Sequence, residues 1–208
     1  QRLGLKCKIF ISENVSESRA EAMKNLDAEV IRVQGNYDNS LKECIKQSAE
    51  NNWEIVQDVS WEGYKEVPKL IMAGYTIMIK EIIDEVDANS ITHVFLQAGV
   101  GGMASAMIAG FAKLSKAIPK FIVVEPENAD CVFKSIKNGR PTSVDIKKET
   151  VMGGMSCGDV SSIAWHILKN SAKYCVTISD EAISSAIALL AEGRLSNEKI
   201  IAGECAVP

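Results

Sequence analysis

The sequence predicts an α/β fold with parallel sheets flanked by helices. Short apolar runs alternate with longer segments whose apolar residues recur every three to four positions, and this alternation continues through the 208 residues. Hydrophobic residues make up 47% of the chain, which is enough to cover such sheets with a packed core. Strands separated by helices form crossover connections, so the sheets are expected to be parallel.

The first part of the chain contains three predicted strands and two predicted helices. Each strand is a short apolar or alternating run, and each helix carries apolar residues on one face. Ser16 precedes the first helix and is of a residue type that caps helix N-termini. The strands are expected at 6–12, 29–33 and 53–58, and the helices at 16–26 and 37–52.

The second part continues the same alternation after a loop that contains Gly63. Pro68 favours the start of a long helix, because proline fits a first helical turn, and the apolar content of this helix predicts that it is mostly buried. Residues 140–160 are predicted to be largely irregular. The helices are expected at 68–86, 102–116, 129–138, 161–170 and 180–194, and the strands at 92–98, 120–126, 174–179 and 199–204.

The loop at 58–67, with its tryptophan, glycine and tyrosine, marks the expected boundary between two α/β domains. We place a smaller domain at 1–58 and a larger one at 59–208. The chain begins with Gln1 in a helix-like context and stops after an apolar run, so it is expected to be a fragment of a longer protein.

Composition argues against several classes of function. The net charge is −4, without blocks of like charge, which argues against binding to nucleic acid or to anionic membranes. The apolar runs fall short of the roughly 20 residues that a membrane span needs, and no signal-peptide pattern is present, so a cytoplasmic protein is expected. The six cysteines stand singly and only two histidines occur, so no metal site is expected.

One turn in the second part has the features of a binding site. In VFLQAGVGGMASAMIAGFAK, residues 94–113, an apolar strand leads through Gly99, Gly101 and Gly102 into a helix of small residues. Glycine adopts positive φ and lets backbone N–H groups approach a ligand, and a helix N-terminus attracts anions. This turn therefore predicts a site for an anionic group such as a phosphate.

Two cofactors suit this turn on the residues alone. Gly99-x-Gly101-x-x-Ala104 matches the relaxed dinucleotide fingerprint, and Glu125 closes the next strand, where a ribose-binding carboxylate is expected. That fingerprint usually opens its domain, whereas here three predicted strands come first. The single phosphate of pyridoxal phosphate (PLP) also suits a compact glycine loop at a helix N-terminus.

Longer motifs carry a resemblance to one family and run in order from end to end of the chain. They are NYD at 36–38, VQDVSWEGYKEVP at 56–68, GY at 74–75, THVFLQAGVGGMA at 92–104, VVEP at 123–126, SCG at 156–158 and GEC at 203–205. Together they resemble diaminopropionate ammonia-lyase, a PLP enzyme of the tryptophan synthase β-like fold group. The resemblance implies PLP as the cofactor and the two-domain architecture of fold type II PLP enzymes, here truncated.

The resemblance also implies roles for individual residues. Asp58 stands where the family has an active-site carboxylate, and such a group acts as a general acid or base when it is partly buried. Trp61, Tyr64 and Tyr37 are expected on the substrate side. One loop corresponds to the segment that binds the PLP phosphate through backbone N–H groups, in agreement with the predicted anion site. Its residues are Gly99, Val100, Gly101, Gly102 and Met103.

Other roles remain open at several positions. Asp58 also suits a loop cap, and Trp61 and Tyr64 also suit a hydrophobic plug between domains. Glu125 is expected near the cofactor, without an assigned role. The last motif of the family is nearer to GESGA, so Cys205 places a thiol where the family has a serine.

The implied activity is that of a lyase that converts 2,3-diaminopropionate to pyruvate and ammonia in amino-acid degradation, as a cytoplasmic homodimer. In this family the lysine that binds PLP lies upstream of the motifs present here, and no lysine of this chain is assigned to that role. The chain by itself is therefore expected to be inactive. Two alternatives are an NAD-dependent oxidoreductase and a non-catalytic module that retains the fold.

Overall fold

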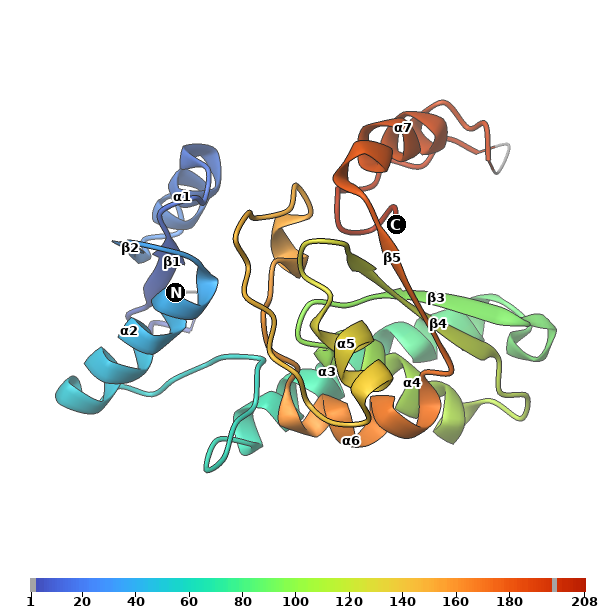
Figure 1. The fold of residues 1–208 in the computed structure, drawn as a ribbon, viewed down its shortest axis with the longest axis horizontal. Coiled ribbons are helices and arrows are strands. Elements are labelled where there is room, and N and C mark those ends of the chain that lie inside the picture. Colours follow the sequence, from blue (N-terminus) through green and yellow to red (C-terminus); the bar gives the residue numbers. More distant parts are fainter. Residues whose placement is uncertain (1–2, 196–197) are drawn as a thin grey trace. The chain divides into compact units, whose positions relative to one another are not determined.

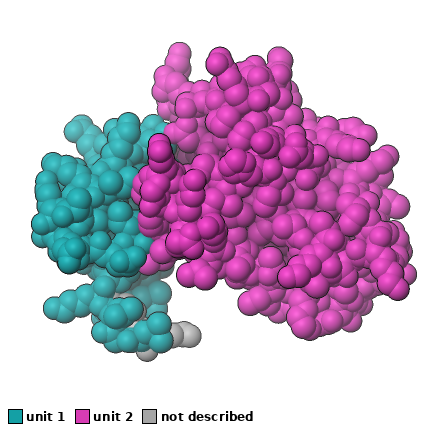
Figure 2. Space-filling view, turned by 90° about the horizontal axis from the view of Figure 1, so that it is seen from below, with its two compact units in different colours: residues 1–55 teal, residues 56–208 magenta. Residues whose placement is uncertain are grey.

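The structure of the chain, a computed structural model, describes residues 3–195 and 198–208. The chain forms two compact units, one over residues 1–55 and one over residues 56–208 (Figure 2). The division falls between Ile55 and Val56, whereas the sequence predicts the boundary after Asp58. Asp58 therefore belongs to the same unit as the glycine loop.

The first unit contains a two-stranded parallel sheet and two helices. Its elements are β1 (Lys8–Ser12), α1 (Glu17–Lys24), β2 (Glu29–Val33) and α2 (Tyr37–Asn51). Lys8 of β1 lies opposite Glu29 of β2, and their side chains form an ion pair at 2.6 Å. The Ser16 hydroxyl accepts a hydrogen bond from the first turn of α1, as its residue type predicts, and Asn36 and Asn39 cap α2 reciprocally.

The strand predicted at 53–58 is wrong, because the structure describes this segment as irregular. Asn52 ends α2 in the left-handed conformation, with φ of +56°. The N–H group of Gln57 then donates to the Tyr64 hydroxyl at 3.0 Å. The Tyr64 side chain therefore accepts a hydrogen bond that a neighbouring strand would accept in a sheet. The alternating pattern of the sequence does not reveal this.

Three parallel strands form the sheet of the second unit, in the order β3-β4-β5. The strands are β3 (His93–Gln97), β4 (Lys120–Pro126) and β5 (Tyr174–Ile178). The helices are α3 (Glu66–Glu85), α4 (Gly102–Leu114), α5 (Cys131–Asn138), α6 (Ser162–Ser171) and α7 (Asp180–Ala191), with short 3-10 turns η1 (Ala88–Ser90) and η2 (Gly153–Met155). These elements confirm the predicted ones, with small differences at their ends.

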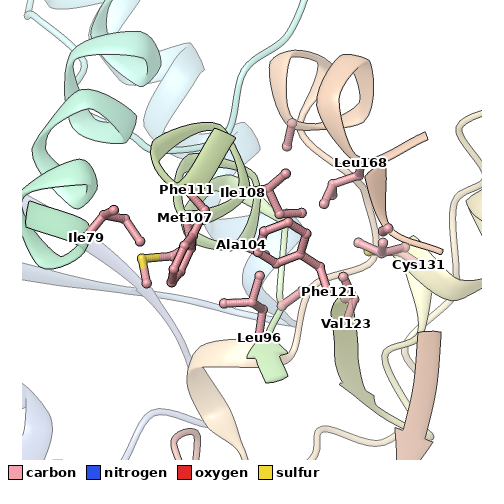
Figure 3. Close-up of a cluster of buried hydrophobic side chains, with 14 of the residues drawn as sticks. Ile79, Leu96, Ala104, Met107, Ile108, Phe111, Phe121, Val123, Cys131 and Leu168 are labelled. Carbon is pink, nitrogen blue, oxygen red and sulfur yellow. The ribbon is translucent and has the colours of Figure 1, made fainter. Parts of the chain in front are cut away.

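Helices α3, α4 and α6 lie together on one side of this sheet (Figure 1). Phe111 of α4 packs against Phe121 of β4, with ring centroids 5.8 Å apart, and both side chains are almost completely buried (Figure 3). Leu96 and Val123 add strand residues to the same core. Because α4 has neighbours on nearly every side, its sequence GMASAMIAGFAKL is apolar all round rather than amphipathic.

Helix α3 is less buried than its apolar content predicts. Its buried residues are Pro68, Met72 and Ile79, whereas Leu70 and Ile77 are 72% and 61% exposed. The prediction of a mostly buried helix is therefore wrong. Apolar residues occur on more than one face of α3, and the face that packs against α4 is only one of them.

The strand predicted at 199–204 is wrong as well, because no strand is described there. The N–H group of Ile200 donates to Leu190 O at 2.9 Å. The segment therefore folds back on the end of α7 instead of extending the sheet.

Gly110 allows α3 and α4 to approach closely. A Cβ at this position would lie 2.7 Å from Cγ1 of Ile79, which is fully buried. We expect Gly110→Ala to lower the free energy of unfolding by about 1–2 kcal/mol, because overpacking outweighs the gain in helix propensity. Gly74 in α3 is the control, since a Cβ there meets nothing within 4 Å, and Gly74→Ala is expected to be neutral or stabilising. Denaturant unfolding compares the two variants, and equal stability contradicts the close contact.

Candidate cofactor-binding site

The glycine loop connects the end of β3 to the start of α4, at the carboxyl edge of the sheet. Gly101 is the N-cap of α4 and has a φ of +85°, a value that favours glycine. It provides no side-chain cap for the first turn, and no acidic residue stands in that turn. The start of α4 therefore presents backbone donors and the positive end of the helix dipole without a carboxylate of its own.

Close packing behind the loop excludes a side chain at two of its glycines. A Cβ on Gly101 would lie 2.7 Å from Cδ1 of Leu168 in α6. A Cβ on Gly99 would lie 3.0 Å from the Cys157 sulfur, in the segment 153–158. The loop is therefore held between α6 and this segment, and its backbone has little freedom to move.

Side chains from outside the helices cap the first turns of α5 and α6. The carboxyl oxygens of Glu125 accept from the N–H groups of Val132 and Phe133, in the first turn of α5, at 2.9 and 2.6 Å. The Ser60 hydroxyl accepts from Ile163 N–H, in the first turn of α6, at 2.9 Å. Helix α4, by contrast, begins at a glycine without a side-chain cap. An anionic ligand would satisfy the donors at that helix start.

The Glu125 side chain ends inside the fold, against the first turn of α5. Its side chain is fully buried at the end of β4. Burial raises the pKa of its carboxyl group to about 8, although the two N–H groups of α5 favour the charged form. Both oxygens contact α5, so the group is not available in the way a ribose-binding carboxylate must be. The structure therefore gives the dinucleotide hypothesis no support.

The segment 150–158, to which the sequence assigns no role, packs against the glycine loop. Asp180 at the start of α7 anchors it, because Thr150 Oγ1 donates to one carboxylate oxygen and Val151 N–H donates to the other, at 3.2 Å. Ser156 is buried, and its hydroxyl has no hydrogen-bond partner among residues 3–195 and 198–208. A buried hydroxyl without a partner in the protein is a candidate for binding a ligand. In the sequence, the SCG motif was the only indication of a role for Ser156.

Asp58 is half-buried in the loop that precedes α3. Burial raises the pKa of its carboxyl group, and its own N–H and that of Val59 act in the opposite direction. The pKa of Tyr75 in α3 is also raised, first by burial and second by the negative charge of Asp58. The structure therefore brings Tyr75 within electrostatic reach of Asp58. Sequence reasoning missed this tyrosine, although the GY motif at 74–75 contains it.

Trp61 and Tyr64 form a tight turn directly after Asp58. Their backbones exchange two hydrogen bonds, at 3.2 and 3.1 Å, and their rings stack with centroids 4.2 Å apart. Because the Tyr64 hydroxyl also bonds the N–H of Gln57, the turn braces the Asp58 segment within the second unit. Tyr37 lies in the first unit, where it begins α2.

In the described part of the chain, no three His, Cys, Asp or Glu side chains gather as the ligands of a metal ion would. None of the helices in that same part is long and apolar enough to cross a membrane.

Together, the parallel sheet and the uncapped glycine turn define an α/β protein with a candidate anion-binding site at a strand-to-helix junction. The chain belongs to the pyridoxal-phosphate dependent enzyme family, whose profile matches residues 1–207. PLP is therefore the cofactor of its family, and the resemblance inferred from the motifs is confirmed.

Diaminopropionate ammonia-lyases are among the relatives of the chain. Diaminopropionate ammonia-lyase of Escherichia coli K12 is 32% identical over 207 residues, which cover 98% of this chain and 52% of that protein. The crystal structure of the E. coli enzyme in complex with an aminoacrylate-PLP azomethine reaction intermediate matches with a TM-score of 0.90 at 31% identity, over 99% of this chain and 53% of the other. The chain thus spans about half the length of the curated relatives it matches.

More distant structures share the fold alone. The processed form of threonine deaminase isoform 2 from Solanum lycopersicum matches with a TM-score of 0.77 at 18% identity, over 96% of this chain and 55% of the other. With the E. coli structure, this match confirms the predicted architecture of fold type II PLP enzymes.

The residues present fit the phosphate group of PLP. The loop 99–103 combines a glycine N-cap, a positive φ and a first helical turn without an acidic residue. A dianionic group is stabilised by such donors and by the helix dipole, and it would be repelled by a carboxylate at the same place. The Ser156 hydroxyl offers a further donor on the segment that packs against the loop.

Buried Glu125 predicts a pH-dependent stability. Its pKa is about 8 in the folded chain and 4.5 in an exposed reference group. The raised pKa contributes its full stabilisation of the folded state below pH 4.5. This contribution falls as the pH rises above 4.5 and is lost once the pH has passed 8. Relative to Glu125→Gln, which cannot titrate, the wild-type chain is expected to lose stability across this range.

Denaturant unfolding at several pH values measures this difference. Glu127→Gln, at an exposed position next to β4, is the control and is expected to keep the wild-type pH dependence. Parallel pH profiles for the wild type and Glu125→Gln contradict a proton held at Glu125.

Proposed function

We propose that this chain is the PLP-phosphate-binding part of a diaminopropionate ammonia-lyase, which converts 2,3-diaminopropionate to pyruvate and ammonia. The observation that carries the proposal is the uncapped glycine turn at Gly101, in a chain that is 32% identical to an enzyme of that name. The order of motifs from NYD to GEC supports the proposal along the length of the chain.

The proposed phosphate site is the loop 99–103. Its backbone N–H groups donate to the phosphate oxygens, and the dipole of α4 adds a favourable interaction with the negative charge. Leu168 and Cys157 pack behind Gly101 and Gly99, so the donors are held in place before the cofactor binds. A site that is organised in advance loses less conformational entropy on binding.

Asp58 is proposed as a general acid or base of the reaction. PLP, when bound, acts as an electron sink for a substrate that loses its α-proton. Burial raises the pKa of Asp58, so its carboxylate holds a proton more strongly than an exposed aspartate does. That property suits a group that takes and returns a proton during the reaction.

Trp61, Tyr64 and Tyr37 are proposed on the substrate side, as the resemblance implies. The stacked rings of Trp61 and Tyr64 stand next to Asp58 in the chain and give that side a rigid aromatic surface. The proposed whole enzyme is a cytoplasmic homodimer that acts on a small amino acid. It has no nucleic-acid or membrane partner in this proposal.

For the 208 residues by themselves, we propose PLP binding without turnover. None of their lysines stands in a motif that matches the Schiff-base site of the family. A PLP enzyme of this kind needs such a lysine to hold its cofactor covalently.

Substitution of Gly101 tests the phosphate site. Gly101→Ala is expected to weaken PLP binding at least about tenfold, because a Cβ there meets Leu168 and strains a residue with positive φ. Gly139→Ala is the control, since Gly139 also has a positive φ but a Cβ there meets nothing within 4 Å. Calorimetric titration with PLP, with NAD as a parallel ligand, measures the effect. Equal PLP affinity for the wild type and Gly101→Ala contradicts the loop assignment.

Substitution of Asp58 tests the proton-transfer role in the whole enzyme. Asp58→Asn is expected to lower the rate of pyruvate release by about 10²–10⁴-fold, because the amide cannot take up a proton, while PLP affinity is retained. Asp84→Asn is the control, since Asp84 is an exposed partner of Lys80 on α3. An Asp58→Asn enzyme with the activity of Asp84→Asn excludes Asp58 as a general acid or base.

A further inference from the structure

Three serine hydroxyl groups meet in the second unit, between the Asp58 segment and the start of α6. Ser60 and Ser161 are 4% and 0% exposed, and their hydroxyl oxygens are 2.7 Å apart. The Ser162 hydroxyl lies 3.0 Å from that of Ser60. Ser60 and Ser161 are 101 positions apart in the chain, so the fold alone brings them together.

Backbone hydrogen bonds reinforce this hydroxyl cluster. Ser60 N–H donates to Ser161 Oγ at 3.1 Å, and Ser162 N–H donates to Ser60 O at 3.2 Å. Ile163 N–H donates to Ser60 Oγ at 2.9 Å, so Ser60 takes the part of an N-cap for α6. Ser161, which occupies the N-cap position in sequence, does not cap the helix with its own side chain. Two buried hydroxyls with this many partners form a rigid connection.

The same helix start also holds the glycine loop. Ser161 N–H donates to the carbonyl oxygen of Val100 at 2.9 Å, in the middle of the loop. Further along α6, Leu168 and Ala164 are the side chains that a Cβ on Gly101 would meet, at 2.7 and 3.4 Å. The first turns of α6 therefore contact the loop through a hydrogen bond and through packing.

We propose that Ser60 and Ser161 are positioning residues, which hold the Asp58 segment and the glycine loop in fixed register through the start of α6. Ser60 lies two positions after Asp58. A displacement of α6 would therefore move the support of the proposed proton-transfer group and the support of the proposed phosphate site together. Catalysis depends on such positions being kept within a fraction of an ångström. The catalytic purpose rests on the proposed function, whereas the coupling between the two segments does not.

Hydrogen exchange in the 208-residue chain without cofactor tests the coupling. Ser60→Ala removes the hydroxyl that joins the segments. The amide protons of Ser161 and Ser105, which donate to the loop carbonyls of Val100 and Gly101 at 2.9 and 3.0 Å, are expected to exchange about tenfold faster, beyond any change in global stability. Ser135→Ala is the matched control, because Ser135 is fully buried and its hydroxyl accepts from Thr142 N–H at 2.9 Å, outside this cluster. This control is expected to lower global stability without selective exchange at the loop.

NMR titration of the Asp58 carboxyl group gives a second readout, with Tyr75 followed as its titrating neighbour. In Ser60→Ala, the pKa of Asp58 is expected to shift toward its ordinary value as the segment loosens and gains water, whereas in Ser135→Ala it stays raised. If Ser60→Ala fails to fold, Ser60→Cys keeps the shape with a weaker hydrogen-bonding group and is expected to show the same changes to a smaller extent.

Unchanged loop exchange and an unchanged Asp58 titration in a folded Ser60 variant overturn the proposal, as does an equal effect of Ser135→Ala. A separate PLP titration of the wild-type chain distinguishes this result from a failure of the proposed function. Absence of PLP binding there counts against the phosphate site, while the exchange data still decide whether Ser60 couples the two segments.

Discussion

The start of α4 is the constraint on which the second unit depends. Its backbone donors stay without a side-chain cap, although the helix behind them is buried by the sheet, α3 and α6. Burial of an unsatisfied N–H group costs free energy, so such an end is stable only when a ligand or water accepts from it. Two glycines make this arrangement possible. Gly101 supplies the positive φ at the N-cap, and Gly110 lets α3 pack directly on α4.

Helices α5 and α6 differ from α4, because a side chain caps the first turn of each. The carboxyl group of Glu125, at the end of β4, caps α5, and the hydroxyl of Ser60, in the loop before α3, caps α6. Each cap also ties a helix start to another segment of the unit, so the edge of the sheet becomes rigid around the glycine loop. Ligands of parallel α/β sheets bind at this carboxyl edge. The family match gives PLP as the cofactor of the family.

Much of the fold follows from patterns within short stretches of sequence. The strands at 29–33 and 120–126 and the start of α4 agree with the structure, because side-chain periodicity and helix-start signals are local properties. The segments at 53–58 and 199–204 have strand-like composition but no strand partner, and a strand exists only when another strand pairs with it. Burial of α3 was overestimated for a related reason, since apolar content does not tell which faces of a helix meet a neighbour.

The sequence by itself determined the glycine turn and its chemistry, because positive φ and a helix start are encoded by adjacent residues. The motifs around it also led to the PLP family. Only the tertiary structure decided that Glu125 caps α5 instead of binding a ribose. It also decided that Tyr75 lies near Asp58 and that Ser60 caps α6. The last of these contacts joins residues about a hundred positions apart. No local pattern specifies such a pair, because the contact exists only after the sheet and its helices have packed.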